Sequence, residues 1–177
     1  MAGNYSIGEI MIDQEQIFKR AAEIGKAITE DFEGQEVLMI GILKGAVLWM
    51  ADLVKQIGLN VYLDFMAVSS YGASTKSTGA VKIVKDLDIP IEGKNVIIVE
   101  DIVDSGITLN YLKNYLLAMK PKSLRICTLL DKPSGRRIDI DVDYIGFTVE
   151  DKFIVGYGLD YNQSYRNFPY ITCLVDG

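Results

Sequence analysis

The sequence contains no histidine, and this absence excludes several catalytic classes. Ser-His-Asp and Cys-His nucleophilic sites, histidine-ligated metals and imidazole acid–base chemistry all require that side chain. There are two cysteines, Cys127 in RICTLL and Cys173 in ITCLVDG, and both lie in apolar, strand-like runs. Their placement favours buried, reduced thiols over a disulfide and excludes a zinc site. Any proton transfer must therefore use a carboxylate, lysine, tyrosine, cysteine or water.

Long apolar runs and an excess of basic residues are also missing. The longest apolar run, VLMIGIL, is too short to cross a bilayer, and the opening MAGNYSIGEIM lacks the basic and apolar regions of a secretory leader. The 18 basic and 24 acidic residues give a net charge of -6, which argues against a nucleic acid or an anionic membrane as the main partner. We therefore expect a cytoplasmic protein with no nucleic-acid or membrane partner.

The chain does contain a regular alternation of strands and helices. The chain has 177 residues, of which 49% are hydrophobic and 4 are prolines. We therefore expect one domain over residues 1–177. The first residues are expected to lead directly to a helix that starts after Asp13 and ends near Gly34. Further helices are predicted at 46–57 and 107–120, and strands at 36–43, 60–68, 80–85, 95–99, 123–130 and 144–149. This alternation indicates an α/β fold with a parallel sheet, whose ligands bind at the carboxyl ends of the strands.

The most informative segment is VIIVEDIVDSGIT at residues 96–108, where an apolar strand meets two acids and then a helix start. Gly106 allows a tight turn, Ser105 and Thr108 offer hydroxyls, and the free amides of the helix start suit a phosphomonoester. Glu100 and Asp101 would repel a phosphate unless they face a divalent cation or ribose hydroxyls. Without further context, the segment also fits a capped helix after a buried strand.

The whole string resembles the phosphoribosyl-diphosphate (PRPP) binding motif of the type I phosphoribosyltransferases, and no GxGxxG or Walker A loop is present. Four more segments resemble the bacterial hypoxanthine-guanine phosphoribosyltransferases, so that the likeness covers nearly the whole chain. They are GILKGA at 41–46, SSYGAS at 69–74, LLDKPSGR at 129–136 and VGYGLDYNQSYRNFPYI at 155–171. The resemblance implies a type I phosphoribosyltransferase fold, in which helices flank a parallel sheet and the two ends of the chain form a small hood. It also implies a homodimer or homotetramer.

The function implied by the resemblance is purine salvage. The 5-phosphoribosyl group of PRPP would move to N9 of hypoxanthine or guanine, giving IMP or GMP and pyrophosphate with Mg²⁺ as cofactor. The residues implied for PRPP and ribose-5-phosphate are Glu100, Asp101, Asp104, Ser105, Gly106, Ile107 and Thr108. Those implied for pyrophosphate are Lys44, Gly45, Ser70, Tyr71 and Arg166. Those implied for the purine are Lys132, Phe153, Ile154 and Asp160, and the metal would be held by Glu100, Asp101 and Asp160.

Several of these residues have individual roles by the same resemblance. Asp104 would be the general base near purine N7, and Lys132 would donate to the 6-oxo group of the base. Phe153 would stack on the base, Ile154 would meet it through its backbone, and Asp160 would position a second Mg²⁺. Taken singly, Phe153 and Ile154 fit core strand positions, and Asp160 fits a surface ion pair.

Some alternatives stay open at the level of sequence. A donor at Lys132 disfavours adenine, but xanthine differs from guanine at C2 and is not separated from it. A PRPP-sensing regulator that binds nucleic acid is disfavoured by the acidic charge. Ser70 and Tyr71 would lie in a loop that closes during reaction, and the Leu43–Lys44 peptide can be cis in the family.

Overall fold

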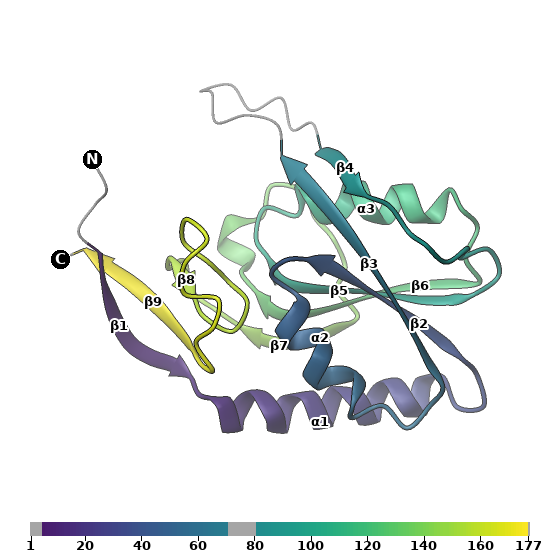
Figure 1. Ribbon diagram of the computed structural model, residues 1–177, viewed down its shortest axis with the longest axis horizontal. Coiled ribbons are helices and arrows are strands. Elements are labelled where there is room, and N and C mark those ends of the chain that lie inside the picture. Colours follow the sequence, from purple (N-terminus) through teal and green to yellow (C-terminus); the bar gives the residue numbers. More distant parts are fainter. Residues whose placement is uncertain (1–4, 71–80, 177) are drawn as a thin grey trace.

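The main sheet occupies the centre of the protein (Figure 1). The computed structural model describes residues 5–70 and 81–176. The sheet has the strand order β4-β3-β2-β5-β6-β7. Its strands are β2 (Val37–Leu43), β3 (Val61–Ser70), β4 (Val81–Lys85), β5 (Asn95–Val103), β6 (Ser123–Asp131) and β7 (Tyr144–Thr148). Every pairing is parallel except that of the edge strand β4 with β3. The predicted α/β class with a mostly parallel sheet is confirmed.

Helices cover both faces of this sheet. The helices α1 (Gln14–Asp31) and α2 (Val47–Val54) pack on one face, and α3 (Ile107–Leu117) packs on the other. Strand β2 is therefore apolar on both sides: Met39 joins the α1–α2 core, while Leu38 and Ile40 join the α3 core. No helix among residues 5–70 and 81–176 has both the length and the apolar character needed to cross a membrane.

The helix starts agree with the sequence better than the helix ends do. Asp13 caps α1, since its Oδ1 accepts from the Gln16 amide at 2.8 Å and the Gln16 side chain accepts from the Asp13 amide at 2.9 Å. The three helices end at Asp31, Val54 and Leu117, each earlier than predicted. The apolar pattern continues past these helix ends because Phe32 and Ile57, which follow α1 and α2, are also buried.

The 95–99 strand is longer than predicted, and this changes where the acids lie. Strand β5 continues to Val103 and keeps its pairing with β6 through Glu100 opposite Thr128 and Ile102 opposite Leu130. Glu100 and Asp101 are thus strand residues and not loop residues. Neighbouring side chains of a strand point to opposite faces of the sheet, so these two carboxylates have different surroundings.

A second sheet joins the two ends of the chain (Figure 1). Its strand order is β1 (Tyr5–Ile12), β9 (Ile171–Asp176) and β8 (Ile154–Val155), all antiparallel. The prediction that the first residues lead directly to a helix is wrong, because β1 precedes it. Strand β1 has one buried residue, Ile12, and its partner strand lies at the far end of the sequence, so its local pattern is weak.

The two cysteines differ in burial. Cys127 in β6 is fully buried, and burial raises the pKa of its thiol to about 12. Cys173 in β9 is partly exposed, so its predicted burial is wrong. The reason is strand alternation: Thr172 and Leu174 face the core, while Cys173 and the exposed Val175 face outward. Both cysteines are free thiols, as predicted.

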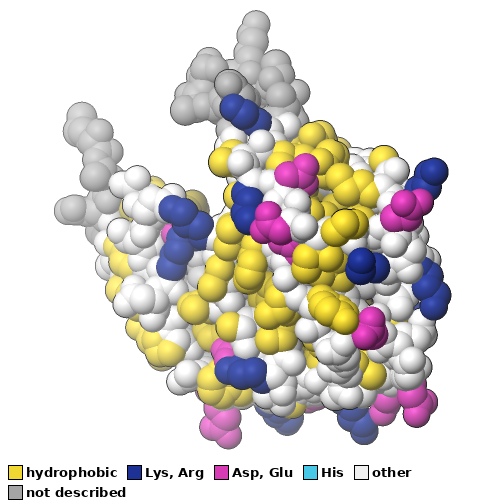
Figure 2. All heavy atoms as spheres, turned by 45° about the vertical axis from the view of Figure 1, so that its right-hand side comes forward, with side chains coloured by type: hydrophobic (Ala, Val, Ile, Leu, Met, Phe, Trp, Pro, Cys, Tyr) yellow, Lys and Arg dark blue, Asp and Glu magenta, His cyan; other side chains and the backbone are white. Residues whose placement is uncertain are grey.

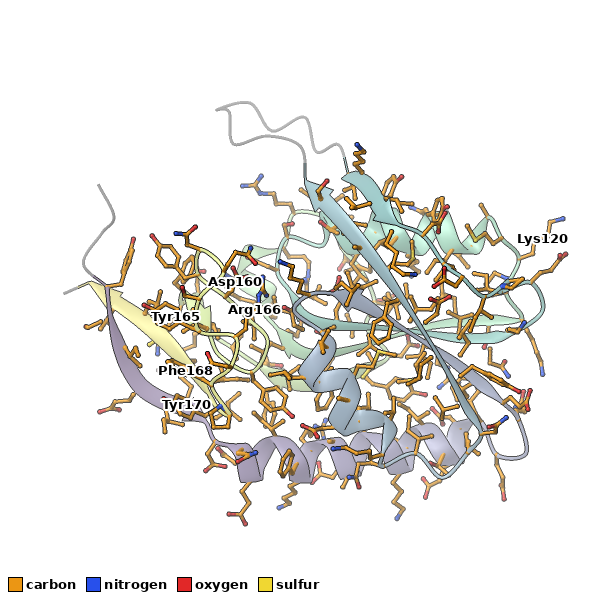
Figure 3. All side chains as sticks on the ribbon, in the orientation of Figure 1. Lys120, Asp160, Tyr165, Arg166, Phe168 and Tyr170 are labelled. Carbon is orange, nitrogen blue, oxygen red and sulfur yellow. The ribbon has the colours of Figure 1, made fainter. Side chains whose placement is uncertain are left out.

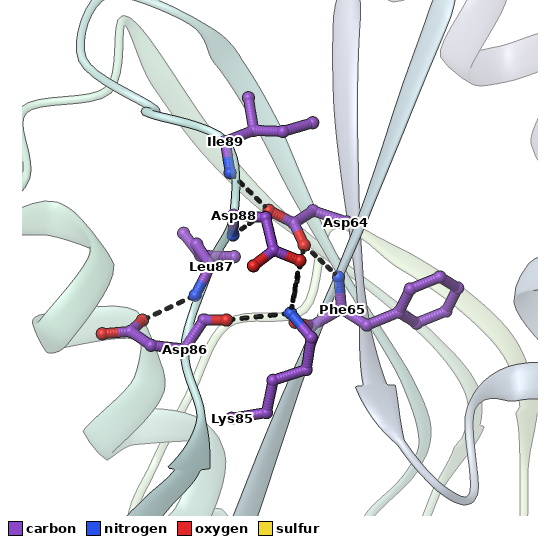
Figure 4. Close-up of polar contacts among 7 residues, drawn as sticks. All are labelled: Asp64, Phe65, Lys85, Asp86, Leu87, Asp88 and Ile89. Atoms are coloured by element: carbon purple, nitrogen blue, oxygen red, sulfur yellow. Dashed lines mark hydrogen bonds and ion pairs between the residues drawn. The ribbon is translucent and has the colours of Figure 1, made fainter.

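A buried carboxylate, Asp64 on β3, fixes the segment between β4 and β5 (Figure 4). It accepts hydrogen bonds from the amides of Phe65, Asp88 and Ile89 at 2.7 to 2.9 Å, and Lys85 Nζ lies 3.6 Å from its Oδ1. Burial acts to raise the pKa of Asp64, but the three amides and the Lys85 charge outweigh it and hold the pKa below 3.8.

Asp64→Asn is expected to lower the free energy of unfolding by about 1–3 kcal/mol at pH 7, because an amide group leaves some of these donors unsatisfied. Since the folded pKa is depressed, the stabilisation by Asp64 is complete above 3.8 and is lost as the pH falls through the lower folded value. Urea unfolding of both chains from pH 7 down to pH 2 measures this. Asp88→Asn, which alters an exposed ion pair with Lys85, is the control. A difference that does not shrink in acid contradicts the assignment.

Candidate active site

The loops that follow β2, β5 and β6 gather at the carboxyl end of the main sheet, as the parallel topology predicts. Two neighbouring cavities lie there. One is lined by Glu100, Ile102, Val103, Asp104, Ser105, Gly106, Thr108 and Leu109. The other, of about 270 Å³, is lined by Asp101, Ile102, Asp104, Lys132, Lys152, Phe153, Ile154, Leu159 and Asp160. Ile102 and Asp104 line both cavities, so the two form adjoining halves of one site.

The first cavity lies at the start of a helix. Its floor is the turn between β5 and α3, in which Gly106 has a φ of 78° that favours glycine over other residues. Gly106 offers no side chain to cap α3, and the Ser105 hydroxyl reaches the Ile107 amide only at 3.4 Å. The first amides of the helix and its positive dipole end are therefore available to a phosphate, together with the hydroxyl of Thr108.

Glu100 and Asp101 face different halves of the site. Glu100 is buried and lines the anion cavity, while Asp101 lines the second cavity. Burial, and then the charge of Asp101, raises the pKa of Glu100 well above its usual value. Burial is also the largest cause of the raised pKa of Asp101. A site that disfavours two negative charges in this way would be stabilised by a cation.

The second cavity has the size and lining for a planar heterocycle. Phe153 is 54% exposed and Ile154 is buried beside it, and both line the cavity, so an aromatic ring is available for stacking. Tyr161 packs edge-on against Phe153 with ring centroids 5.4 Å apart. The cavity therefore combines an aromatic wall with polar groups at its base.

Lys132 supplies the cationic donor of this cavity. Its Nζ lies 3.2 Å from Asp104 Oδ2 and 3.3 Å from Asp151 Oδ1. Burial acts to lower the pKa of Lys132, but the two carboxylates raise it, so the group stays protonated and can donate hydrogen bonds. Asp151 was not predicted, because three charged residues adjoin in EDK and nothing in the sequence says which one faces Lys132.

A third group of residues lies between α2 and the loop that joins β8 to β9. Lys44 Nζ donates to Gln163 Oε1 at 3.2 Å, and Arg166 approaches the same oxygen at 3.4 Å. Arg166 also pairs with Asp160 at 2.7 Å, and Figure 3 shows these two side chains close together. The sequence-predicted cations Lys44 and Arg166 thus come within reach of one group. The peptide bond between Leu43 and Lys44 is cis.

The remaining predicted residues have the following positions. Gly45 packs so closely on the Asp101 carboxylate that a Cβ there would overlap it. Ser70 is the last residue of β3, and Tyr71 lies outside the described residues. Asp160 lines the second cavity with Asp101, but in residues 5–70 and 81–176 no group of three potential metal ligands converges.

Arg136 is a further residue that the sequence did not identify. It donates to the Asp104 carbonyl at 2.8 Å and pairs with the Asp131 carboxylate, so it ties the anion-binding turn to the end of β6. Its only sequence signal is its place in LLDKPSGR, the segment in which Lys132 was the residue predicted to bind the base.

Comparisons with known proteins agree with this geometry. Residues 9–162 match the phosphoribosyl transferase domain family. The hypoxanthine-guanine phosphoribosyltransferase of Bacillus subtilis (strain 168) is 52% identical over 170 residues, which are 96% of this chain and 94% of that protein. The hypoxanthine phosphoribosyltransferase of Escherichia coli (strain K12) is 49% identical over 165 residues, covering 92% and 93% of the two chains.

Solved structures give the same result in three dimensions. A hypoxanthine-guanine phosphoribosyltransferase from Bacillus anthracis, crystallised with HEPES in its active site, has a TM-score of 0.92 at 48% identity, covering 96% of this chain and 100% of that chain. A Trypanosoma cruzi hypoxanthine phosphoribosyl transferase, studied for the role of its C-terminal region in oligomeric state and activity, has a TM-score of 0.91 at 35% identity, covering 99% and 94%.

Proposed function

This chain belongs to the phosphoribosyl transferase family, and we propose that it is a purine-salvage enzyme that transfers the 5-phosphoribosyl group of PRPP to N9 of hypoxanthine or guanine. The products are IMP or GMP and pyrophosphate. The observation that carries the proposal is the shared wall of the two cavities. Asp104 lies between an anion-binding helix start and an aromatic-walled pocket with a cationic donor, which is the arrangement that a phosphorylated sugar and a base require.

The reaction breaks the C1′–oxygen bond of PRPP through a transition state with oxocarbenium character. The amides from Asp104 to Thr108 hold the 5-phosphate, and Phe153 and Lys132 orient the base, so that N9 faces C1′. Asp104 accepts the proton of the base near N7. Lys44 and Arg166 stabilise the departing pyrophosphate. The proposal assigns the remaining residues as follows. Glu100 and Asp101 bind the ribose, and Ile154 binds the base. The phosphate is bound by Ser105, Gly106 and Ile107, and pyrophosphate by Gly45, Ser70 and Tyr71.

Mg²⁺ is the cofactor of the proposal, and the donor set fits it. Glu100, Asp101 and Asp160 offer carboxylate oxygens, which are the ligands that this ion prefers, and Mg²⁺ takes only one or two from a protein while substrate and water complete its shell. When bound, the ion would neutralise negative charge on the pyrophosphate.

The proposal also covers how the chain is organised. Residues 1–177 act as one phosphoribosyltransferase domain, in which the β1-β9-β8 sheet is the hood. The enzyme is a cytoplasmic homodimer or homotetramer. Several large hydrophobic side chains are exposed, and Figure 2 shows hydrophobic side chains gathered on one face, which supports assembly. On the same face, basic and acidic side chains are interspersed, which gives no support to a nucleic-acid partner.

The test is an ultraviolet assay with PRPP and Mg²⁺ in which hypoxanthine, guanine, xanthine and adenine are offered in parallel, with a metal-free control. We expect magnesium-dependent turnover of hypoxanthine and guanine and none of adenine. The same assay ranks xanthine. If no base is turned over by a protein that binds PRPP, the proposal is wrong.

Lys132→Ala is expected to raise the KM for hypoxanthine and guanine roughly 10- to 100-fold, the range of a charged hydrogen bond, and to change the KM for PRPP far less. Steady-state kinetics with each substrate varied in turn measures this. Lys152→Ala is the matched control, because Lys152 lines the same cavity but is half-exposed and pairs with Glu150. Equal effects of the two substitutions would show that Lys132 does not select the base.

A further inference from the structure

One partly buried hydrogen bond outside the catalytic residues connects the loop that holds Arg166 to α2, the helix that follows Lys44. The Tyr157 hydroxyl donates to Asp52 Oδ2. Tyr157 is 3% exposed and belongs to the same apolar cluster as Trp49 and Leu53 of α2. Asp52 lies on α2, and its other oxygen pairs with Lys55 at 2.6 Å. A phenol that is buried against a carboxylate has a fixed position, since leaving either group unpaired is costly.

The loop that contains Tyr157 is cross-linked by its own hydrogen bonds. The Tyr157 amide donates to the Phe168 carbonyl at 2.9 Å, and the Gly158 amide donates to the Arg166 carbonyl at 3.0 Å. The Arg166 guanidinium in turn donates to the Gly158 carbonyl at 2.6 Å. Displacement of residues 157 and 158 therefore displaces Arg166 as well.

The same segment packs directly on the loop before α2. Gly158 has a φ of 102°, and a Cβ there would overlap the Gly45 carbonyl oxygen. Gly45 in turn packs on Asp101. Asp52 lies on α2, seven residues after Gly45, which belongs to the turn before that helix. Tyr157 and Gly158 can therefore contact α2 and the Lys44–Gly45 loop together.

We infer that Tyr157 and Asp52 are a positioning pair, which sets the distance between the two pyrophosphate-binding loops by fixing residues 156–168 against α2. This inference rests on the proposed function for the identity of the ligand. Neither residue touches substrate in this assignment. Their effect is on the alignment of Arg166 with Lys44, and so on the pyrophosphate half of PRPP and not on the base.

Tyr157→Phe tests the pair, and the chain offers a matched control. Tyr144 is also buried and donates to a carboxylate, Asp31 Oδ2, at 2.7 Å, but it joins β7 to the end of α1. Tyr144→Phe thus removes the same kind of phenol–carboxylate hydrogen bond away from the site, together with the hydrogen bond that the Tyr144 hydroxyl accepts from Arg125 at 2.6 Å. We expect Tyr144→Phe to lose at least as much thermal stability as Tyr157→Phe. Only Tyr157→Phe should raise the KM for PRPP, by about 10- to 100-fold, with the KM for hypoxanthine unchanged.

Two further measurements make the result independent of turnover. Calorimetric binding of magnesium pyrophosphate should weaken by a similar factor in Tyr157→Phe and stay at the wild-type value in Tyr144→Phe. Asp52→Asn should reproduce the Tyr157→Phe effect, and the double variant should be no worse than either single one. If Tyr157→Phe and Tyr144→Phe are alike in these substrate readouts, the pair is only structural and the inference is wrong. A wild-type chain that turns over no base overturns the proposed function instead, and pyrophosphate binding still decides the inference.

Discussion

Asp104→Asn is expected to lower kcat by about 10²- to 10⁴-fold while PRPP binding is retained, because positioned acid–base groups contribute that much to rate. The amide has the shape of the carboxylate but cannot accept the proton of the base. The backbone of the anion-binding turn keeps its contacts, since the Asp104 carbonyl still accepts from Arg136. The measurement is kcat with hypoxanthine at saturating PRPP, together with calorimetric PRPP binding.

The control for Asp104 must separate proton transfer from the loss of an ion pair with Lys132. Asp151→Asn removes the other partner of that ammonium group, at nearly the same distance, and leaves Asp104 intact. Because Asp151 is largely exposed, we expect a loss of no more than about fivefold. Unchanged turnover in Asp104→Asn would refute the general-base assignment. Equal losses in both variants would assign the effect to Lys132 orientation.

Gly45→Ala is expected to reduce kcat/KM for PRPP by about 10²-fold, although it adds a single methyl group. That methyl would overlap the Asp101 carboxylate, so either Asp101 or the loop must shift, and Gly158 already packs against the Gly45 carbonyl of that loop. A displacement of about 1 Å in a group that orients substrate produces losses of this size. Steady-state kinetics with PRPP as the varied substrate measures the effect.

Gly58→Ala is the matched control for Gly45→Ala. Gly58 follows α2, is exposed, and a Cβ there would meet Thr29 at 3.4 Å, an ordinary contact. Wild-type kinetics are expected, and circular dichroism shows whether both variants fold. A Gly45→Ala enzyme with wild-type kcat/KM would mean that Asp101 can shift without consequence, and its assigned role near the ribose would then be lost.

Local sequence was sufficient where function depends on contiguous residues. The segment 96–108 places an apolar strand, a turn at Gly106 and a helix start in order, and α3 begins at Ile107 beside an anion-sized cavity. The α/β class followed from the spacing of apolar residues for the same reason, since periodicity is a local property. The family resemblance added the residues from four separate segments, which no local argument could have joined.

The sequence did not reveal contacts between distant segments. Strand β1 was missed because its partner β9 lies at the other end of the chain. The extent of β5 depended on pairing with β6, and that pairing places Glu100 and Asp101 on opposite faces instead of in one loop. The hydrogen bond from Tyr157 to Asp52 spans 105 residues, and neither residue stands out in its own segment.

By itself the sequence therefore determined the fold class, the turn between β5 and α3 and, through resemblance, the chemistry to expect. Tertiary structure alone decided which groups face one another: Lys132 with Asp151, Gly45 with Asp101, and Lys44 with Arg166 through Gln163. The physical reason is that propensity, periodicity and turn formation act over a few residues. The position of a side chain in a site is set instead by how whole strands and helices pack.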